Sequence, residues 1–248
     1  MIFKIDFMKQ LFLYILAPLL FLSCSISEPT NGEELIALMH KKYASSWYQT
    51  LTFKQATIYY DAEEKVAREQ TWYEAMLLPN SLAIKFDSIT SGNGIVFKND
   101  SIYNFKDGKK IASRPLYHPL LILGFSVYAQ QPQKTINDLK KLQIDLSKIK
   151  TTTWQGKENY VVGDENANHF YIEKERLLFT KLIQKQANNT HRETQFNKYE
   201  PLQKGWISPE VLFFTNGKLT LKEVYSEIKT PVLTKEVFDV NQFQKSNW

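Results

Sequence analysis

The clearest structural signal in this chain of 248 residues is the run Val211-Leu212-Phe213-Phe214-Thr215-Asn216-Gly217-Lys218-Leu219-Thr220-Leu221. Asn-Gly between two apolar runs is the strongest short-range sign of a two-residue β-hairpin turn. Working outward, runs rich in β-branched and aromatic residues with a period near two recur through most of the chain. The expected strands cover residues 47–60, 66–78, 81–86, 94–98, 101–105, 151–155, 159–162, 170–173, 178–185, 192–199, 207–214 and 218–228.

Three segments depart from this period of two. Residues 33–43 place apolar side chains at helical spacing, with acids at the start and bases at the end, and predict an amphipathic helix. Residues 116–125 are apolar, lie beyond Pro115 and do not alternate, which favours a short helix or lid, and residues 135–142 predict a second short helix. The sequence therefore predicts a mainly β (α+β) fold with about eleven strands in a single, strongly curved antiparallel sheet covered by helices.

The amino-terminal region has the pattern of an export signal. An apolar run over residues 9–23 is too short for a membrane span and ends at Cys24, after which the chain becomes polar. Phe21-Leu22-Ser23-Cys24 resembles the bacterial lipobox, in which the signal is cut before a cysteine that is then acylated. We therefore expect a signal peptide at 1–23, a lipid-anchored tether at 24–32 and a single domain at 33–248. Met8 is an alternative start, and a cysteine in an anchor helix is the alternative reading of Cys24.

Charge and composition narrow the function classes. The chain has 31 Lys+Arg against 26 Asp+Glu, a net charge of +5, and 43% hydrophobic residues. Only four of the bases are arginine, and the lysines are dispersed along the chain. This dispersion argues against nucleic acid as a partner, because nucleic-acid-binding surfaces cluster their bases. The single cysteine leaves no possibility of an internal disulfide.

No motif of known chemistry stands out. The four histidines fall in different predicted elements without metal-ligand spacing, and no P-loop, G-x-G-x-x-G or G-x-S-x-G motif is present. The pairs Glu63-Glu64 and Asp164-Glu165 lie in predicted turns, where solvated charge is the ordinary explanation. His118 precedes the apolar segment and is expected to pack against it. We therefore predict no metal, no cofactor and no catalysis, with a hydrolase built on these carboxylates or on His118 as a minor alternative.

Apolar side chains on the strands are in excess. They alternate with polar neighbours, as a sheet with one wet and one buried face requires. The members are Trp72, Leu82, Ile84, Phe86, Phe97, Tyr103, Phe105, Phe170, Ile172, Leu182, Phe213, Leu219 and Leu221. Because one or two helices cannot fill the concave face of such a sheet, the remainder is expected to be a cavity or a partner site.

Several segments, taken in order, resemble a known family. They are a lipid-modified start, an amphipathic helix, the run 48–55, Trp72 leading to Leu78-Pro79-Asn80-Ser81-Leu82, and Ile95 to Phe105. The segment from His118 to Ile122, strands within 170–183, and Trp206 to Lys218 follow in the same order. The chain is similar to the lipoprotein carrier family of the Lol pathway (LolA/LolB-like, outer membrane lipoprotein-sorting proteins), of the Bacteroidetes type.

This resemblance implies a half-open antiparallel β-barrel closed by helices, with acyl chains carried in an apolar cavity. Residues 116–125 would form its cap, and the strand residues named above, together with Phe53, Leu120, Leu121 and Ile122, would line it. Cys24 makes the membrane-bound acceptor the nearer comparison, since the soluble carrier has no anchor. A carrier needs no catalytic residue, because each buried methylene contributes about 0.8 kcal/mol.

The expected function is therefore a monomeric, lipid-anchored binding protein of the cell envelope, at the outer membrane and facing the periplasm. It would hold acyl chains of lipoproteins or phospholipids, in lipoprotein sorting or lipid transport. The alternative is a non-catalytic envelope scaffold with the same fold, whose concave face is filled by its own side chains and which binds a protein partner.

Overall fold

A computed structural model describes residues 28–186 and 188–248. Its helical elements are α1 (Gly32–Tyr43), α2 (Pro119–Gly124), η1 (Ser126–Tyr128), α3 (Pro132–Lys141) and η2 (Lys235–Phe238). Its strands are β1 (Thr50–Tyr60), β2 (Val66–Leu77), β3 (Ser81–Phe86), β4 (Gly94–Lys98), β5 (Ser101–Lys106), β6 (Lys109–Pro115), β7 (Ile149–Trp154), β8 (Lys157–Gly163), β9 (His169–Glu173), β10 (Leu178–Lys185), β11 (His191–Asn197), β12 (Glu200–Leu202), β13 (Gly205–Ile207), β14 (Glu210–Thr215) and β15 (Lys218–Lys229).

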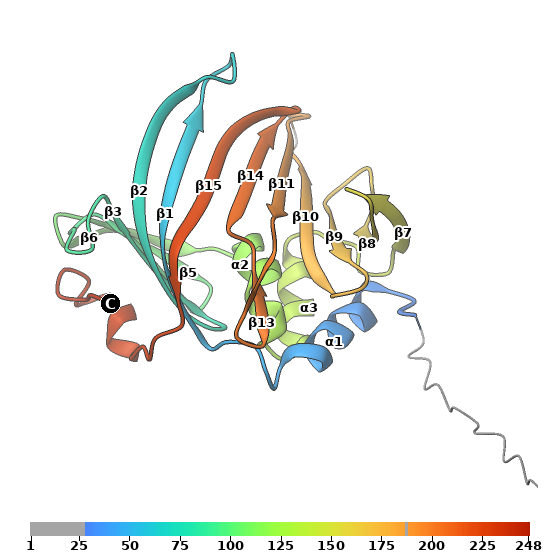
Figure 1. The fold of residues 1–248 in the computed structure, drawn as a ribbon, viewed down its shortest axis with the longest axis horizontal. Coiled ribbons are helices and arrows are strands. Elements are labelled where there is room, and N and C mark those ends of the chain that lie inside the picture. The colour runs from blue at the N-terminus through green and yellow to red at the C-terminus, as the bar shows by residue number, and fades with distance from the viewer. Residues whose placement is uncertain (1–27, 187) are drawn as a thin grey trace, which may run out of the picture.

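Thirteen of these strands form one antiparallel sheet in the order β6-β5-β4-β3-β2-β1-β15-β14-β11-β10-β9-β8-β7. Its first and last strands do not pair, so the sheet curves without closing into a barrel, and α1, α2 and α3 gather on one of its faces (Figure 1). Strands β12 and β13 form a separate small hairpin. The prediction of a mainly β fold with a strongly curved antiparallel sheet and few helices is confirmed.

The Asn216-Gly217 turn lies where the sequence predicts it. Both residues have positive φ, 51° and 80°, and Thr215 pairs with Lys218 across the turn between β14 and β15. This hairpin occupies the centre of the sheet, because β15 also pairs with β1. It therefore joins the amino-terminal and carboxyl-terminal halves of the chain into one sheet.

The strand predictions need four corrections, one of which is that β12 (Glu200–Leu202) was not predicted. The expected strand at 207–214 is interrupted after Ile207, where the Ser208 hydroxyl lies 2.7 Å from the Asn197 carbonyl oxygen and Pro209 has no amide hydrogen to donate. The expected strand at 47–60 begins only at Thr50, because Trp47 and Tyr48 pack in the core. Strand β6 was not predicted; all its residues are exposed, and its lysines and arginine are typical of a protected sheet edge.

The first helix begins where its capping residues place it. The Asn31 side chain accepts a hydrogen bond from the Glu34 amide at 2.9 Å, and the Glu34 carboxylate accepts one from the Thr30 amide at 2.8 Å. This reciprocal arrangement satisfies amide groups that the first turn leaves without partners. Leu35, Ile36 and Met39 are then fully buried on the helix face toward the sheet.

The two faces of the sheet carry separate cores. The concave face packs against α1, α2, α3 and η1. The opposite face carries Ala75, Ala83, Val96 and Phe105, which are covered by the carboxyl-terminal segment after Pro231. Lys85 is fully buried beneath that segment, donates to the Ser246 carbonyl oxygen and has its pKa lowered by burial.

Within residues 28–186 and 188–248, no helix is both long and apolar enough to cross a membrane. The predicted signal peptide, Cys24 and the first residues of the tether lie outside the residues that the structure describes.

Candidate functional site

An apolar pocket of about 330 Å³ lies between the concave face of the sheet and the segment containing α2. The lining strands are β1 to β5, β11, β14 and β15. The lining residues are Gln55, Trp72, Glu74, Met76, Leu82, Ile84, Ile95, Phe97, Ile102, Leu116, His118, Leu120, Leu121, Phe125, Phe196, Phe213, Glu223 and Tyr225. Most of these side chains are apolar or aromatic, as in small-molecule binding pockets.

The pocket exists because the helical layer covers the sheet unevenly. Over β8 to β10, helices and large residues such as Tyr128 and Leu123 bury the sheet face completely. On the β2 to β5 side the cover is mainly α2, whose six residues span about 9 Å. Because neighbouring strands lie roughly 4.8 Å apart, so short a helix cannot cover four of them.

A second, wider pocket of about 620 Å³ adjoins the first. The two share Leu116, His118, Leu120 and Phe213. The second is lined in addition by polar side chains, among them Arg192, Glu193 and Thr215. The two pockets thus adjoin at the lid segment and together form a groove whose outer part contains more polar side chains than its inner part.

Besides His118, four polar side chains interrupt the inner pocket, namely Gln55, Glu74, Glu223 and Tyr225. Burial raises the pKa of Glu223 to about 7 and that of Glu74 well above its ordinary value, and the Glu223 charge raises the Glu74 pKa further. The Tyr225 hydroxyl donates to the Glu223 carboxylate at 2.9 Å, and the Gln55 amide donates to the Thr57 hydroxyl at 2.8 Å. The pocket is therefore apolar in its walls and acidic at one place.

His118 serves the lid segment. Its Nδ1 accepts a hydrogen bond from the Leu121 amide at 3.3 Å, which caps the start of α2, and its ring lies edge-on to Phe97. Burial lowers the pKa of His118 to about 4, so the ring is neutral near pH 7. His118 thus contacts the lid helix through Nδ1, while its ring packs on Phe97 of the sheet, where the sequence predicted ring packing on the lid.

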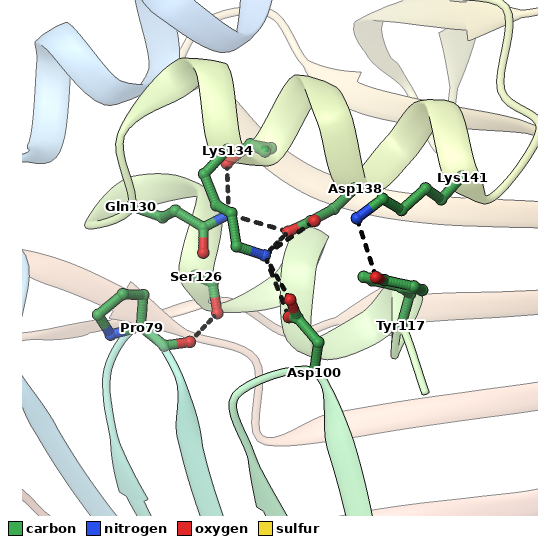
Figure 2. A network of polar contacts seen from close by, with 9 residues as sticks. Pro79, Asp100, Tyr117, Ser126, Gln130, Lys134, Asp138 and Lys141 are labelled. Atoms are coloured by element: carbon green, nitrogen blue, oxygen red, sulfur yellow. Dashed lines mark hydrogen bonds and ion pairs between the residues drawn. The ribbon is translucent and has the colours of Figure 1, made fainter. Parts of the chain in front are cut away.

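A polar network holds the helical layer to the sheet on one side of the pocket (Figure 2). Lys134 of α3 contacts Asp138 at 2.6 Å and reaches Asp100, in the β4–β5 turn, at 2.9 Å. The Ser126 hydroxyl donates to the Pro79 carbonyl oxygen at 2.6 Å, and the Leu116 amide donates to the Asp100 carbonyl oxygen at 2.9 Å. Both ends of the lid segment are thus fixed, whereas its middle lies over the pocket.

The structure brings together part of the predicted binding set. The residues that line the inner pocket are Trp72, Leu82, Ile84, Phe97, Leu120, Leu121 and Phe213. Leu221 lines the outer pocket, and Ile122 lines a small recess beside the lid. Phe53 stacks on Tyr225 with ring centroids 4.2 Å apart, and Phe86 lies 5.2 Å from Trp72, so both support lining residues without lining the pocket themselves.

The other predicted residues lie elsewhere. Phe170, Ile172 and Leu182 are buried in the closed core beneath the helices, and Leu219 is partly buried near the start of β15. Tyr103 and Phe105 do not line the cavity, which corrects the expectation. They alternate with Ile102 along β5 and so point to the opposite face, where Phe105 stacks on Phe243 at 4.2 Å.

Glu74 and Glu223, the acidic residues of the inner pocket, were not predicted from the sequence. Glu74 follows Trp72 and precedes Met76 in the same alternation, so the period of two alone places its carboxyl on the apolar face. Glu223 stands in the same relation to Leu221 and Tyr225. The signal that could have found both residues is a charged side chain that shares one face of a strand with apolar side chains.

The carboxylate pairs considered as catalytic candidates lie apart from the pocket. Asp164 pairs with Lys148, and Glu165 lies 2.5 Å from Lys150, in an exposed turn. Glu64 accepts a hydrogen bond from the Leu219 amide at 2.8 Å at the tip of the β1–β2 hairpin. Among the described residues no three His, Cys, Asp or Glu side chains are grouped so that they could hold a metal ion.

Comparison with solved structures identifies the architecture. A LolA superfamily protein from Nitrosomonas europaea superposes with a TM-score of 0.54 at 9% identity, covering 82% of this chain and 97% of that one. The chain has the LolA-like fold. A domain described as an outer membrane lipoprotein-sorting protein, from Vibrio parahaemolyticus, gives 0.56 at 12% identity over 86% of this chain and 98% of that one.

A DUF1329 family protein from Desulfovibrio piger gives the same TM-score of 0.56, at 12% identity over 84% of this chain and 95% of that one. No protein-family model and no curated protein sequence matches the chain. The similarity to these proteins is therefore a similarity of fold, and it covers most of the chain.

Proposed function

We propose that this protein binds acyl chains of lipoproteins or lipids in the pocket under α2 and serves lipoprotein sorting or lipid transport at the cell envelope. The observation that supports this proposal is the apolar pocket between the concave sheet face and the α2 segment, where the helices cover the sheet only in part. Two structures with the same fold bear the names LolA superfamily protein and outer membrane lipoprotein-sorting protein domain. The role is non-catalytic, since partitioning of a chain into such a pocket requires only apolar area and shape.

The size of the groove supports this ligand class. The inner pocket of about 330 Å³ and the outer one of about 620 Å³ fall within the roughly 300–1,000 Å³ of pockets that bind small molecules. Ile84, Phe97 and Leu121 offer apolar walls to a methylene chain. At about 0.8 kcal/mol per buried methylene, a chain of a dozen carbons gains enough to compete with a membrane.

We also propose that the protein is attached to the membrane through Cys24 after residues 1–23 are removed. The lipobox-like run before Cys24 supports acylation, and more than one acyl chain gives stable anchoring. The site of action would then be the outer membrane, on its periplasmic side. In a protein whose residues 1–23 are replaced by a cleavable secretory signal, Cys24→Ala is expected to move the protein from the membrane fraction to the soluble fraction.

Displacement of a neutral fluorescent probe, N-phenyl-1-naphthylamine, by dodecanol tests binding in the pocket. Ile95→Trp places a larger side chain in the inner pocket and is expected to weaken dodecanol binding about tenfold or more, a loss of about 1.4 kcal/mol. Ile111→Trp is the matched control, because Ile111 is 62% exposed on the edge strand β6. Unchanged affinity in Ile95→Trp, or no probe uptake by either protein, would favour the scaffold alternative.

A further inference from the structure

The Glu74 carboxyl is an exceptional group in the pocket wall. Glu74 is 5% exposed, and its neighbours at the same face of β2, Trp72 and Met76, line the pocket with it. None of the described residues forms a hydrogen bond or an ion pair with its carboxyl oxygens. The side chain is buried as a whole, but its oxygens are not among the fully enclosed polar atoms without a partner, so they are open to the pocket, where a group supplied from outside would satisfy them.

Glu223 brings a second carboxyl to the same wall. Strand β1 lies between β2 and β15, and it pairs Phe53 with Glu74 and Thr57 with Glu223. Gln55 lies between these two levels, with its amide group donating to the Thr57 hydroxyl. The amide oxygen of Gln55 and the two carboxyls thus give this part of the wall an excess of acceptors.

Among the described residues that line the inner pocket with Glu74 and Glu223, none is a lysine or an arginine. The titratable residues lining the inner pocket are Glu74 on β2, Glu223 and Tyr225 on β15, and His118 before α2. Tyr199 lies close enough to Tyr225 to influence it, and it carries no charge near pH 7. Arg192 and Glu193 line the outer pocket and do not line the inner one.

We propose that the inner pocket selects amphiphiles with a protonated amine, whose ammonium group lies between Glu74 and Glu223 while the alkyl chain packs against the apolar walls. This inference rests on the proposed function, since the chain occupies the pocket assigned above. An ammonium group has only donors and a positive charge, which complements a site with acceptors and two carboxyls. Replacing the two carboxyls by apolar residues would serve a pocket for plain hydrocarbon better.

The proposal predicts a dependence on pH. An ammonium ligand favours the ionised carboxyls, so binding must release protons where the carboxyls of the free protein are protonated. The Glu223 pKa of about 7 places the release of that proton near neutral pH, and burial raises the pKa of Glu74 in the same direction. The affinity for an amine amphiphile therefore rises from pH 5.5 to pH 8, while that for an uncharged amphiphile stays constant.

The experiment compares dodecylamine with dodecanol, which have the same chain length, as displacers of the neutral probe from the Cys24→Ala protein. We expect dodecylamine to bind about tenfold or more tightly than dodecanol at pH 8, with a smaller ratio at pH 5.5. The double variant Glu74→Gln/Glu223→Gln is expected to lose the preference, measured as the ratio of the dodecylamine and dodecanol affinities within the same protein. Glu227→Gln, an exposed position on the same strand β15, is the matched control and keeps the preference.

Equal affinities for the amine and the alcohol, or a preference that persists in the double variant, would overturn the proposal and leave acyl-chain binding intact. Failure of both amphiphiles to displace the probe would instead refute the proposed function itself. Where the double variant does not fold, Glu74→Gln alone supplies the comparison, since it removes the carboxyl without a partner. A loss of preference in that variant supports the assignment, and full retention contradicts it.

Discussion

Glu223 is a single residue that affects both the stability of the folded protein and the binding properties of the inner pocket. Its carboxyl accepts a hydrogen bond from Tyr225, at 2.9 Å, and lies in the wall of the inner pocket together with Gln55 and Glu74. Burial raises its pKa from 4.5 to about 7, so the folded protein prefers the protonated form. The folded chain therefore binds a proton more tightly than the unfolded chain does.

The sign of the resulting pH effect follows directly. The raised pKa gives a stability contribution that is fully present below about pH 4.5 and is lost as pH rises to about 7, above which it is constant. We expect the stability of the unmodified protein relative to Glu223→Gln to fall across that window, by at most about 1.4 kcal/mol per pH unit. Urea unfolding of both proteins at pH 4, 5.5, 7 and 8 measures this difference.

The contribution of His118 has the opposite sign, because its pKa is lowered to about 4 and protonation favours the unfolded chain. It is present in both proteins and largely cancels in the comparison. A stability difference that rises with pH, or one that does not change with pH, would contradict the assignment of Glu223 as a buried, pKa-raised carboxyl.

At the scale of elements, the polar network around Lys134 fastens α3 to the sheet. The Asp138 side chain is only 2% exposed and lies 2.6 Å from Lys134, which also contacts Asp100 (Figure 2). Removing Lys134 leaves a buried carboxylate whose remaining contact is with Gln130, at 3.4 Å. A buried charge that loses its partner destabilises a protein far more than the loss of a surface pair does.

Lys134→Met is accordingly expected to destabilise the protein by about 1–3 kcal/mol, since Lys134 itself is partly solvated. Lys140→Met on the same helix removes an exposed pair with Glu33 and is expected to change the stability by less than about 1 kcal/mol. Urea unfolding monitored by tryptophan fluorescence compares the two. Equal effects of both substitutions would show that the Lys134 network does not hold the helical layer.

The carboxyl-terminal segment is the second element with a testable role. Phe243 is 1% exposed and stacks on Phe105 at a centroid distance of 4.2 Å, so it covers the convex face of the sheet. Phe243→Ala is expected to cost about 3–5 kcal/mol, as other large-to-small substitutions in cores do. Lys245→Ala, at an exposed position two residues on, serves as control in the same thermal unfolding measurement, and an effect of Phe243→Ala no larger than that of the control would refute the packing role.

The sequence predicted elements well where periodicity and turn chemistry agree, as at Asn216-Gly217 and at helix α1. It failed at β6, because an edge strand that is exposed on both faces has no apolar alternation to detect. It also assigned Tyr103 and Phe105 to the wrong face. Alternation separates the two faces of a strand, but it does not tell which face is concave when both are buried.

The pocket was predictable only in outline. An excess of apolar strand positions over the available helical cover indicates a cavity, and seven of the predicted lining residues do line one. Its boundaries depend on the length and position of α2, which determine which sheet positions stay uncovered. Phe196 entered the site through that tertiary arrangement, whereas Ile95 shares a strand face with the predicted Phe97 and could have been included by the period of two.

Across the whole molecule, the helices cover one half of the open sheet fully and the other half only in part, and the second half therefore retains a binding site. The half over β8 to β10 is closed by α1, α3 and large aromatic residues, whereas the half over β2 to β5 retains a groove. We propose that this groove holds an acyl or alkyl chain.

Native mass spectrometry of the Cys24→Ala protein, isolated from the periplasm, tests that claim most directly. We expect a species heavier by one amphiphile with an acyl or alkyl chain, which disappears after organic extraction, returns on addition of the lipid and is reduced in Ile95→Trp. A protein that shows only its own mass, before and after addition of phospholipid, lipopeptide or alkylamine, would contradict binding of such a chain in the groove.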